Sequence, residues 1–261
     1  MEITWLKVPE WESYPGLLHG FIGRRGGRSV GAYAGLNVSL RVGDEMQAVK
    51  NNICDIKHAV GIHDGRIVTM RQVHGDGIVE VADTSGKEAG EADAMVTRER
   101  ETYLGILTAD CVPILLVAPK RKVVAVVHAG WRGTLAGIGL KMVRRFQEKY
   151  DIAAADIEAA LGPSIGACCY EIQDDVSRPL LEQWGTRADS SLERRKSGCF
   201  LDLRRLNRDI LETAGVPRTR VYEIGPCTSC AKDEFFSYRR ERAETGRQLS
   251  FIGWLPSNNK P

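Results

Sequence analysis

The sequence predicts a mixed α+β or layered α/β fold, and two patterns in the chain carry this expectation. Short segments rich in β-branched and aliphatic residues come in runs through its middle, and amphipathic helical segments separate some of them. No GxGxxG or Walker motif marks a nucleotide-phosphate loop. A chain of 261 residues is of ordinary size for one α/β domain, so we expect residues 1–261 to form a single domain.

In the first quarter of the chain we expect a loop followed by a helix. Glycine and arginine dominate residues 23–28, which are the most loop-like stretch. A helix over residues 44–60 follows, because apolar residues recur there near i, i+3 and i+4 and Gly61 can end it.

The middle of the chain is richer in strands. Five short segments have the composition of strands, namely residues 66–70, 77–82, 103–107, 114–117 and 123–127. Residues 119–122 form a polar turn, so the last two of these strands should make a hairpin. An amphipathic helix then opens at Thr134, with the apolar stripe Leu135, Ile138, Met142 and Phe146. A further strand is expected over residues 157–161.

The last third of the chain should add two helices and two strands. The helices are expected over residues 174–184 and 203–214. A final strand pair is expected near residues 221–224 and 249–254. Together with the preceding runs of strands, these elements indicate a sheet structure with helices packed on it.

Composition and charge exclude several classes of partner. Lys and Arg total 36 against 34 Asp and Glu, so electrostatics give no reason to expect nucleic acid or an anionic membrane. The longest apolar stretch, residues 103–119, is interrupted by Asp110 and Pro113 and should not span a membrane. The N-terminus lacks the regions of a signal peptide, and seven cysteines form no regular framework. We therefore expect a cytoplasmic protein with reduced thiols, and leave its oligomeric state open.

Two of the five histidines stand where chemistry is often placed. His74 ends a predicted strand and precedes a glycine, which lets a backbone turn or a ligand approach closely. His128 lies between a buried strand and a helix, in the segment His-Ala-Gly-Trp-Arg-Gly. Strand ends of this kind are where α/β proteins tend to place their sites. Either histidine alone could equally well cap a strand.

Cys111 follows an acid at a predicted strand break. Pro113 cannot donate to a sheet ladder, so the chain should bend there or lie at a sheet edge. Strand alternation sends Asp110 and Cys111 to opposite faces unless the break turns one of them, and we choose Cys111 for the site. Cys54 and Cys199, by contrast, are expected to be small packing residues.

Two imidazoles and one thiolate make a three-ligand zinc set with a fourth position open, as catalytic zinc requires. His74, Cys111 and His128 are therefore the predicted metal ligands. Cys227 and Cys230 form a single CxxC without a second pair, so a structural zinc finger is not expected. The adjacent pair Cys168–Cys169 is interpreted as packing near a turn.

Several basic residues lie beside these candidates. Arg71 comes three residues before His74, Arg132 four after His128, and Tyr238 and Arg239 lie near the end of the chain. A single arginine is ordinarily a solvated surface charge. Their positions beside the metal candidates favour a clamp for phosphate or carboxylate.

Five segments together resemble the laccase-domain family. They are Arg-Gln-Val-His-Gly at 71–75, Glu-Ala-Asp-Ala at 91–94, Thr-Ala-Asp-Cys-Val-Pro at 108–113, His-Ala-Gly-Trp-Arg-Gly at 128–133 and Gly-Pro-Ser-Ile-Gly at 162–166. The resemblance extends from His19 to Arg247 and so covers nearly the whole chain. Members of this family were long labelled multicopper polyphenol oxidases and are now regarded as zinc-dependent purine nucleoside phosphorylases.

The resemblance implies a layered α/β/β/α fold, similar to that of toxin deamidases that use a Cys–His pair. It implies zinc on His74, Cys111 and His128. It also implies phosphorolysis of adenosine, inosine, guanosine or methylthioadenosine, together with adenosine deamination, so purine nucleosides and phosphate are the expected partners. Many relatives carry a tyrosine soon after the position of Cys227, and this chain does not, so Cys230 receives no role from the family.

The leading hypothesis is thus a zinc-dependent nucleoside enzyme. Deamination needs a carboxylate that moves a proton beside the adenine C6, and Asp93 is the candidate. Phosphorolysis needs phosphate held against the ribose C1′, with Arg71 and Arg132 as candidates.

Three alternatives remain open from the residues. A copper oxidase is disfavoured, because a trinuclear copper cluster needs many more imidazoles than five histidines supply. A metal-free cysteine hydrolase would use Cys111 as nucleophile and His128 as base, which leaves His74 without a task. A zinc-stabilised binding module would unfold rather than lose activity when Cys111 is replaced.

Overall fold

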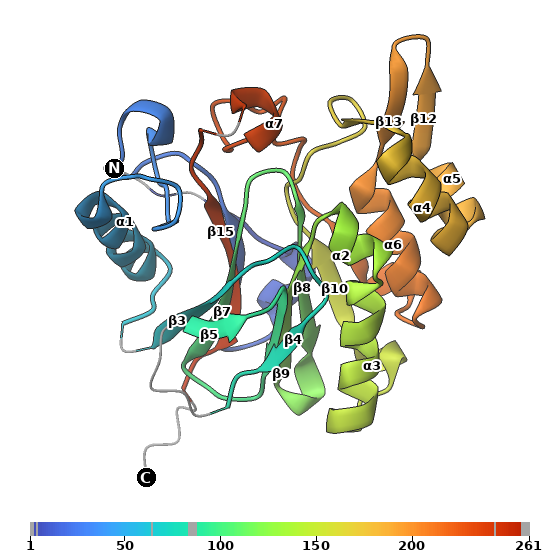
Figure 1. The fold of residues 1–261 in the computed structure, drawn as a ribbon. Helices are drawn as coiled ribbons and strands as arrows, with labels where there is room; N and C mark the ends of the chain where they lie inside the picture. The colour runs from blue at the N-terminus through green and yellow to red at the C-terminus, as the bar shows by residue number, and fades with distance from the viewer. Residues whose placement is uncertain (1–2, 4, 64, 83–87, 243, 257–261) are drawn as a thin grey trace.

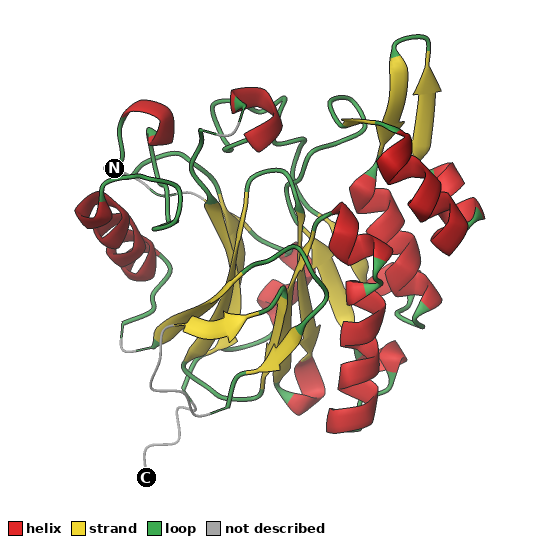
Figure 2. Ribbon diagram, in the orientation of Figure 1, coloured by secondary structure: helices red, strands yellow, loops and turns green. Residues whose placement is uncertain are grey.

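A computed structural model describes residues 3, 5–63, 65–82, 88–242 and 244–256 of the chain. Two six-stranded sheets pack face to face, and helices cover the outward faces of both (Figures 1 and 2). The first sheet contains, in order across it, β1 (Trp5–Leu6), β2 (Leu17–Ile22), β15 (Gln248–Trp254), β7 (Thr102–Thr108), β3 (Arg66–Arg71) and β5 (Glu88–Glu91).

The second sheet contains the longest hairpin of the molecule. Its strands are, in order, β14 (Val221–Glu223), β10 (Glu158–Leu161), β8 (Val112–Ala118), β9 (Val123–Ala129), β6 (Ala94–Thr97) and β4 (Ile78–Glu80). A small third sheet pairs β11 (Glu171–Ile172), β13 (Gly198–Leu201) and β12 (Leu192–Arg195). Each of the two large sheets contains both parallel and antiparallel pairs, so both are mixed.

Helices pack on both outer faces. Helix α1 (Met46–Ala59) covers the first sheet. The second sheet is covered by α2 (Trp131–Leu135), α3 (Ile138–Tyr150), α4 (Asp174–Trp184), α5 (Thr186–Ser190) and α6 (Leu203–Thr213). Helix α7 (Tyr238–Glu241) lies at the upper end of the molecule in Figure 1. Five short 3₁₀ turns, η1 (Pro9–Ser13), η2 (Gly31–Tyr33), η3 (Pro119–Arg121), η4 (Ala154–Asp156) and η5 (Arg218–Arg220), complete the described elements. The layers run α/β/β/α, which confirms the expected fold.

Alternation along the central strands explains the two inner layers. In β8, Ile114 and Leu116 pack toward the helices, whereas Leu115 and Val117 pack toward the other sheet. All residues of β8 and β9 are buried, so both faces of these strands are apolar. Such continuous hydrophobic strands are typical of a sheet that is covered on both sides.

Several sequence predictions are confirmed. The helix expected over residues 44–60 is α1, where Glu45 caps the start by accepting hydrogen bonds from two backbone N–H groups. The helices expected over 174–184 and 203–214 are α4 and α6. The predicted hairpin joins β8 to β9 through η3, and Lys122 follows it in the left-handed region at φ 55°.

Other predictions are corrected. The helix expected to open at Thr134 is two helices, because Gly137 adopts φ 74° and breaks the chain between α2 and α3. The expected final strand pair does not form, since β14 pairs with β10 and β15 pairs with β2 and β7. Pro113 was expected at a bend or an edge, but it lies second in the central strand β8, opposite His128. The bend comes earlier, at Asp110.

The described residues contain no helix that is long and apolar enough to cross a membrane. The strand directions instead determine where three loops meet. Strands β3 and β7 are parallel, and β8 returns antiparallel to β9. The loop after β7 leads directly into β8, and Ala129 at the end of β9 pairs with Val112 at the start of β8. The loops that follow β3, β7 and β9 therefore lie at one end of the two sheets.

Candidate metal centre and active site

Three side chains from those loops come together. His74 lies in the loop after β3, Cys111 between β7 and β8, and His128 near the end of β9. One nitrogen of each histidine and the Cys111 sulfur all lie within 4.8 Å of one another. The structure thus brings together the three predicted metal ligands.

The backbone at this point adopts uncommon conformations. His74 has φ 59° and Asp110 has φ 99°, values that residues other than glycine rarely adopt. Gly130 leaves room for the site, because a Cβ there would lie 3.2 Å from Cys111 Sγ and 3.3 Å from the Cδ2 of His74. Such backbone strain is typical of sites where function fixes the geometry.

Asp93 lies directly behind the histidines and is fully buried. Its carboxylate accepts hydrogen bonds from the backbone N–H groups of Val73, His74 and Gly75, at 3.2, 3.0 and 2.7 Å. Its Oδ1 also lies 2.8 Å from His128 Nδ1. One carboxylate therefore fixes the loop that carries His74 and the ring of His128.

Asp110 and Cys111 lie in the bend between β7 and β8, so strand alternation does not apply to them, yet their side chains have different partners. The Asp110 carboxylate accepts a hydrogen bond from Thr228 Oγ1 and another from the backbone N–H of Arg239, both at 2.7 Å. The Cys111 sulfur points to the histidines instead. Asp110 thus anchors the loops on the opposite side of the site.

Electrostatics couple the sulfur to the two rings. Burial alone would raise the pKa of the Cys111 thiol, but His128 and His74 lower that pKa to about 6. Burial would lower the pKa of His128, but Cys111 and Asp93 raise it to about 9. The protein by itself therefore favours a thiolate at Cys111 near neutral pH, and a thiolate is the form that binds metals.

Burial would raise the pKa of Asp93, yet hydrogen bonds from His128 and the backbone lower it below its ordinary value. Asp93 is therefore held as a carboxylate. An acid that is inaccessible, ionised and fully hydrogen-bonded is poorly placed to move a proton to and from a substrate.

Of the basic and aromatic candidates, two lie near the anchored loops. Arg239 is 5.0 Å from the ring centroid of Tyr170 and donates to the backbone O of Glu171 at 2.8 Å. Tyr238 is half exposed, and the Arg247 guanidinium lies 5.8 Å from its ring centroid.

The other two candidates are exposed at the surface. Arg132 stacks on the ring of its neighbour Trp131, 4.3 Å from the centroid, and is exposed. Arg71 forms an ion pair with Glu91, and both side chains are more than half exposed. A carboxylate at the surface thus already pairs with the Arg71 guanidinium.

Two residues of the site were not singled out from the sequence. Burial and then the negative charge of Cys111 raise the pKa of Tyr170 to about 12, so its hydroxyl stays protonated beside the site. Burial lowers the pKa of Arg247, while the charges of Cys111 and Tyr238 oppose the shift. Arg247 had a signal in the sequence, since Gly246–Arg247 belongs to the segments that resemble the family.

The remaining histidines lie away from the three ligands. His19 lies within β2, where its Nε2 accepts a hydrogen bond from the backbone N–H of Val8. His58 and His63 pair with each other at a ring distance of 6.4 Å. Among the described residues, His74 and His128 are thus the histidines that join a possible metal site.

The cysteine expectations need two corrections. Cys54 was expected to be a packing residue like Cys199, but it lies exposed on α1. Cys168 and Cys169 were interpreted as packing near a turn, and the CxxC at Cys227 and Cys230 as lacking a second pair. The four sulfurs instead lie within 4.8 Å of one another. Sequence reasoning missed this because the pairs are far apart in the chain and meet through their loops.

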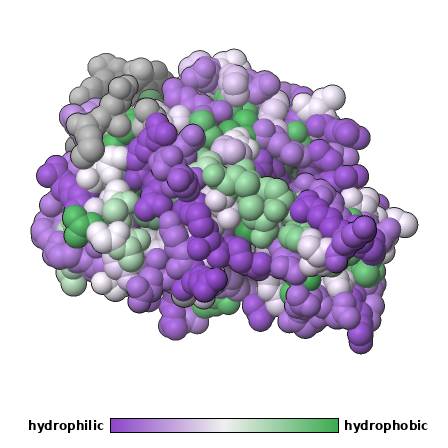
Figure 3. Space-filling model, turned by 90° about the horizontal axis from the view of Figure 1, so that it is seen from above, coloured by the Kyte–Doolittle hydropathy of each residue, from purple (hydrophilic) through white to green (hydrophobic). Residues whose placement is uncertain are grey.

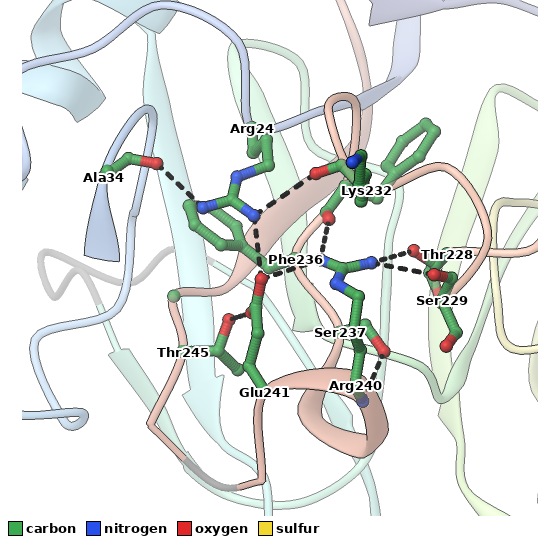
Figure 4. A network of polar contacts seen from close by, with 12 residues as sticks. Arg24, Ala34, Thr228, Ser229, Lys232, Phe236, Ser237, Arg240, Glu241 and Thr245 are labelled. Carbon is green, nitrogen blue, oxygen red and sulfur yellow. Dashed lines mark hydrogen bonds and ion pairs between the residues drawn. The ribbon is translucent and has the colours of Figure 1, made fainter. Parts of the chain in front are cut away.

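A polar network supports the loops around the site (Figure 4). Arg240 donates to the backbone O of Thr228 and of Ser229, at 2.7 and 3.1 Å. Glu241 accepts from both Arg24 and Arg240, at 2.9 and 2.8 Å. Helix α7 is thereby tied to the loop after β14 and to the N-terminal loop.

The same end of the molecule carries a less polar area. Seen from above, a patch of weakly hydrophobic surface lies near the middle and hydrophilic residues surround it (Figure 3). Val73, in the loop after β3, and Tyr238, the first residue of α7, are among the large hydrophobic side chains that are about half exposed.

An α/β/β/α fold with two histidines and a cysteine at converging strand ends defines a candidate metalloenzyme. The chain belongs to the family described as multi-copper polyphenol oxidoreductase laccase, whose pattern matches residues 18–255.

Its relatives include enzymes with two kinds of name. It is 38% identical over 249 residues to the purine nucleoside phosphorylase YlmD of Geobacillus stearothermophilus, covering 92% of this chain and 91% of the relative. It is 36% identical over 241 residues to a purine nucleoside phosphorylase of Deinococcus radiodurans, covering 90% and 88%. It is 35% identical over 231 residues to adenosine deaminase RL5 of an unknown prokaryotic organism, covering 85% and 87%.

Solved structures share the fold. The crystal structure of YlmD from Geobacillus stearothermophilus matches with a TM-score of 0.90 at 37% identity, over 97% of this chain and 96% of that one. The group of possible metal ligands and the enzyme names of the relatives both indicate that the chain is an enzyme.

Proposed function

We propose that this protein is a zinc-dependent purine nucleoside phosphorylase with adenosine deaminase activity. The observation that carries the proposal is the His74–Cys111–His128 group, whose ligand atoms lie within 4.8 Å of one another at the end of both sheets. The phosphorylase and deaminase names of the relatives support the reaction class.

The donor set fits zinc. Two imidazoles and a thiolate are zinc ligands in catalytic sites that keep one position open. A bound zinc supplies a Lewis acid that polarises a substrate oxygen or activates water. The other three histidines lie elsewhere, so the described residues do not supply the many imidazoles of a multicopper centre, and copper stays disfavoured.

The chain's own residues would do the positioning. Asp93 holds His128 through Nδ1 and leaves the Nε2 of that ring free for the ion. We propose this positioning role for Asp93 in place of the proton shuttle suggested by the sequence, because its oxygens are already occupied and inaccessible.

Substrate would bind where the loops carry charge and aromatic surface. Arg247 and Arg239 are the guanidinium groups that we propose for phosphate, with Arg132 at the outer side. Tyr238, which is half exposed, would pack against the purine. The protonated hydroxyl of Tyr170 is available to donate a hydrogen bond.

The test is a product assay on adenosine with and without phosphate. Phosphorolysis predicts adenine and ribose 1-phosphate only when phosphate is present, whereas deamination predicts inosine in either buffer. Equal release of adenine without phosphate would contradict phosphorolysis. If zinc-loaded protein formed neither adenine nor inosine, that result would overturn the proposal.

A metal-free cysteine hydrolase is the second candidate, and one observation favours it. The pKa of Cys111 is lowered to about 6 while that of His128 is raised to about 9, so the protein without metal favours a thiolate–imidazolium pair. Alkylation of Cys111 by iodoacetamide separates the two candidates. Zinc should protect the thiolate in a metalloenzyme, and a hydrolase would keep its activity after chelation.

A further inference from the structure

Two loops at one sheet edge bring four cysteines together. Strands β10 and β14 are parallel neighbours, so the loops that follow them leave the sheet side by side. The first loop carries Cys168 and Cys169, and the second carries Cys227 and Cys230. The backbone joins the loops directly, through a bridge between Ser164 and Cys227.

The sulfur positions fit one tetrahedral ion. All four Sγ atoms lie within 4.8 Å of one another, and Cys230 Sγ is 3.5 Å from that of Cys168 and 3.4 Å from that of Cys169. Four thiolates at the usual Zn–S distance of about 2.3 Å around one zinc are separated by about 3.8 Å. A disulfide would need two sulfurs at about 2.0 Å, and all four of these cysteines are free.

Two groups favour a thiolate at Cys227. The backbone N–H of Gly166 donates to the Cys227 sulfur at 3.2 Å. Arg204 lies beside the same cysteine, and its guanidinium donates to Ser164 Oγ at 3.2 Å, to the backbone O of Gly225 at 2.8 Å and to that of Pro226 at 3.2 Å. A cation held at this place can balance part of the negative charge that four thiolates leave on a divalent ion.

We propose that Cys168, Cys169, Cys227 and Cys230 bind one structural Zn²⁺, separate from the ion at His74, Cys111 and His128. A closed set of four thiolates leaves no open position, which is the arrangement of structural zinc rather than catalytic zinc. This site does not depend on the proposed function.

The ion would hold one wall of the active site. Thr228, next to Cys227, donates through Oγ1 to Asp110, the neighbour of Cys111. Tyr170, next to Cys169, stands in the field of the Cys111 thiolate. On its far side the CxxC loop is held by Arg240, which binds the carbonyls of Thr228 and Ser229 (Figure 4). An ion at the four cysteines would fasten both loops at their base.

Metal content tests the proposal without any activity assay. The full chain is purified with a reducing agent and without chelators, and zinc per chain is measured by elemental analysis. We expect two zinc ions in the wild type, one in Cys230→Ser and one in His74→Ala. The matched control is Cys54→Ser, an exposed cysteine outside the cluster, which should retain two.

The His74→Ala protein keeps the proposal testable even if Cys230→Ser does not fold. It leaves the four cysteines intact and should retain one zinc ion, which Cys168→Ser in the same background should remove. A His74→Ala protein that holds no zinc would overturn the proposal. The proposal would also be overturned by wild-type protein that holds one zinc ion and whose mass is two hydrogens below that of the chain with four free thiols, the loss expected for one disulfide.

A failure of this site is distinguishable from a failure of the proposed function. Loss of the second zinc equivalent concerns the cysteine cluster alone. Absence of phosphorolysis in protein that contains two zinc ions would concern the His74–Cys111–His128 site alone.

Discussion

Asp93 Oδ1 lies 2.8 Å from His128 Nδ1, and the same carboxylate binds the backbone N–H of His74. One buried acid thus sets the orientation of one histidine ring of the candidate metal site and the position of the loop that carries the other. Carboxylates that hold ligand histidines in this way fix the tautomer of the ring and strengthen it as a ligand.

Asp93→Asn should weaken zinc binding by about 10–100-fold, the usual cost of losing such a partner. The amide keeps the shape but replaces one acceptor by a donor that faces backbone N–H groups. Competition with a chelator measures the affinity, and Glu91→Gln on the exposed neighbouring strand is the control. An unchanged affinity would contradict the positioning role. Activity that returns at saturating zinc would separate positioning from proton transfer.

Gly130→Ala should lower zinc affinity while the protein stays folded. The added Cβ would lie 3.2 Å from Cys111 Sγ and 3.3 Å from His74 Cδ2, so two ligands would have to move. Gly77→Ala is a matched control, because a Cβ there meets Ala92 only at ordinary contact distances of 3.7 and 3.8 Å. Zinc content and thermal unfolding of both variants give the result. Equal zinc content in the two would show that the close approach at Gly130 is unimportant.

Arg247→Lys should raise the KM for phosphate by about 10-fold or more, since loss of one guanidinium–phosphate contact costs roughly 1.5–3 kcal/mol. The Arg247 side chain is largely buried, and its Nη1 donates to the carbonyls of Thr245 and Gly246, which fixes its direction. Arg71→Ala should change the same KM by less than about 2-fold, because Arg71 pairs with Glu91 at the surface. Steady-state phosphorolysis of adenosine compares the two. A larger effect at Arg71 would reverse the assignment.

Hydrophobic patterning was enough to predict the central strands and helices α1, α4 and α6. The choice of His74, Cys111 and His128 rested on the chemistry of the donors and on the family resemblance, and the structure brings these three side chains together. Short and long apolar runs are local signals, and His74, Cys111 and His128 each stand at the end of one. The role of Asp93 is not local, because it arises from backbone groups 18 to 20 residues away and from a ring 35 residues away. The cysteine cluster likewise needs the pairing of β10 with β14, which no spacing in the sequence reveals.

Strand β2 holds another contact that the local sequence does not reveal, and this contact leads to a prediction about pH. His19 interrupts its apolar residues, yet the ring is 5% exposed and its Nε2 accepts from the backbone N–H of Val8 at 3.0 Å. Burial lowers the pKa of His19 to about 4, from an ordinary value near 6.5. The unfolded chain therefore binds a proton between these two pH values that the folded protein does not bind.

Since the unfolded state takes up the extra proton, stability should fall as pH drops from about 6.5 to about 4 and should not change from this source above 6.5. A shift of this size corresponds to about 3 kcal/mol of unfolding free energy across that window. His19→Gln keeps an acceptor for Val8 but does not titrate, so its unfolding free energy should decline less over the same range. Urea unfolding at pH 7, 5.5 and 4.5 measures both slopes. Parallel slopes for the two proteins would show that His19 is not the group that titrates.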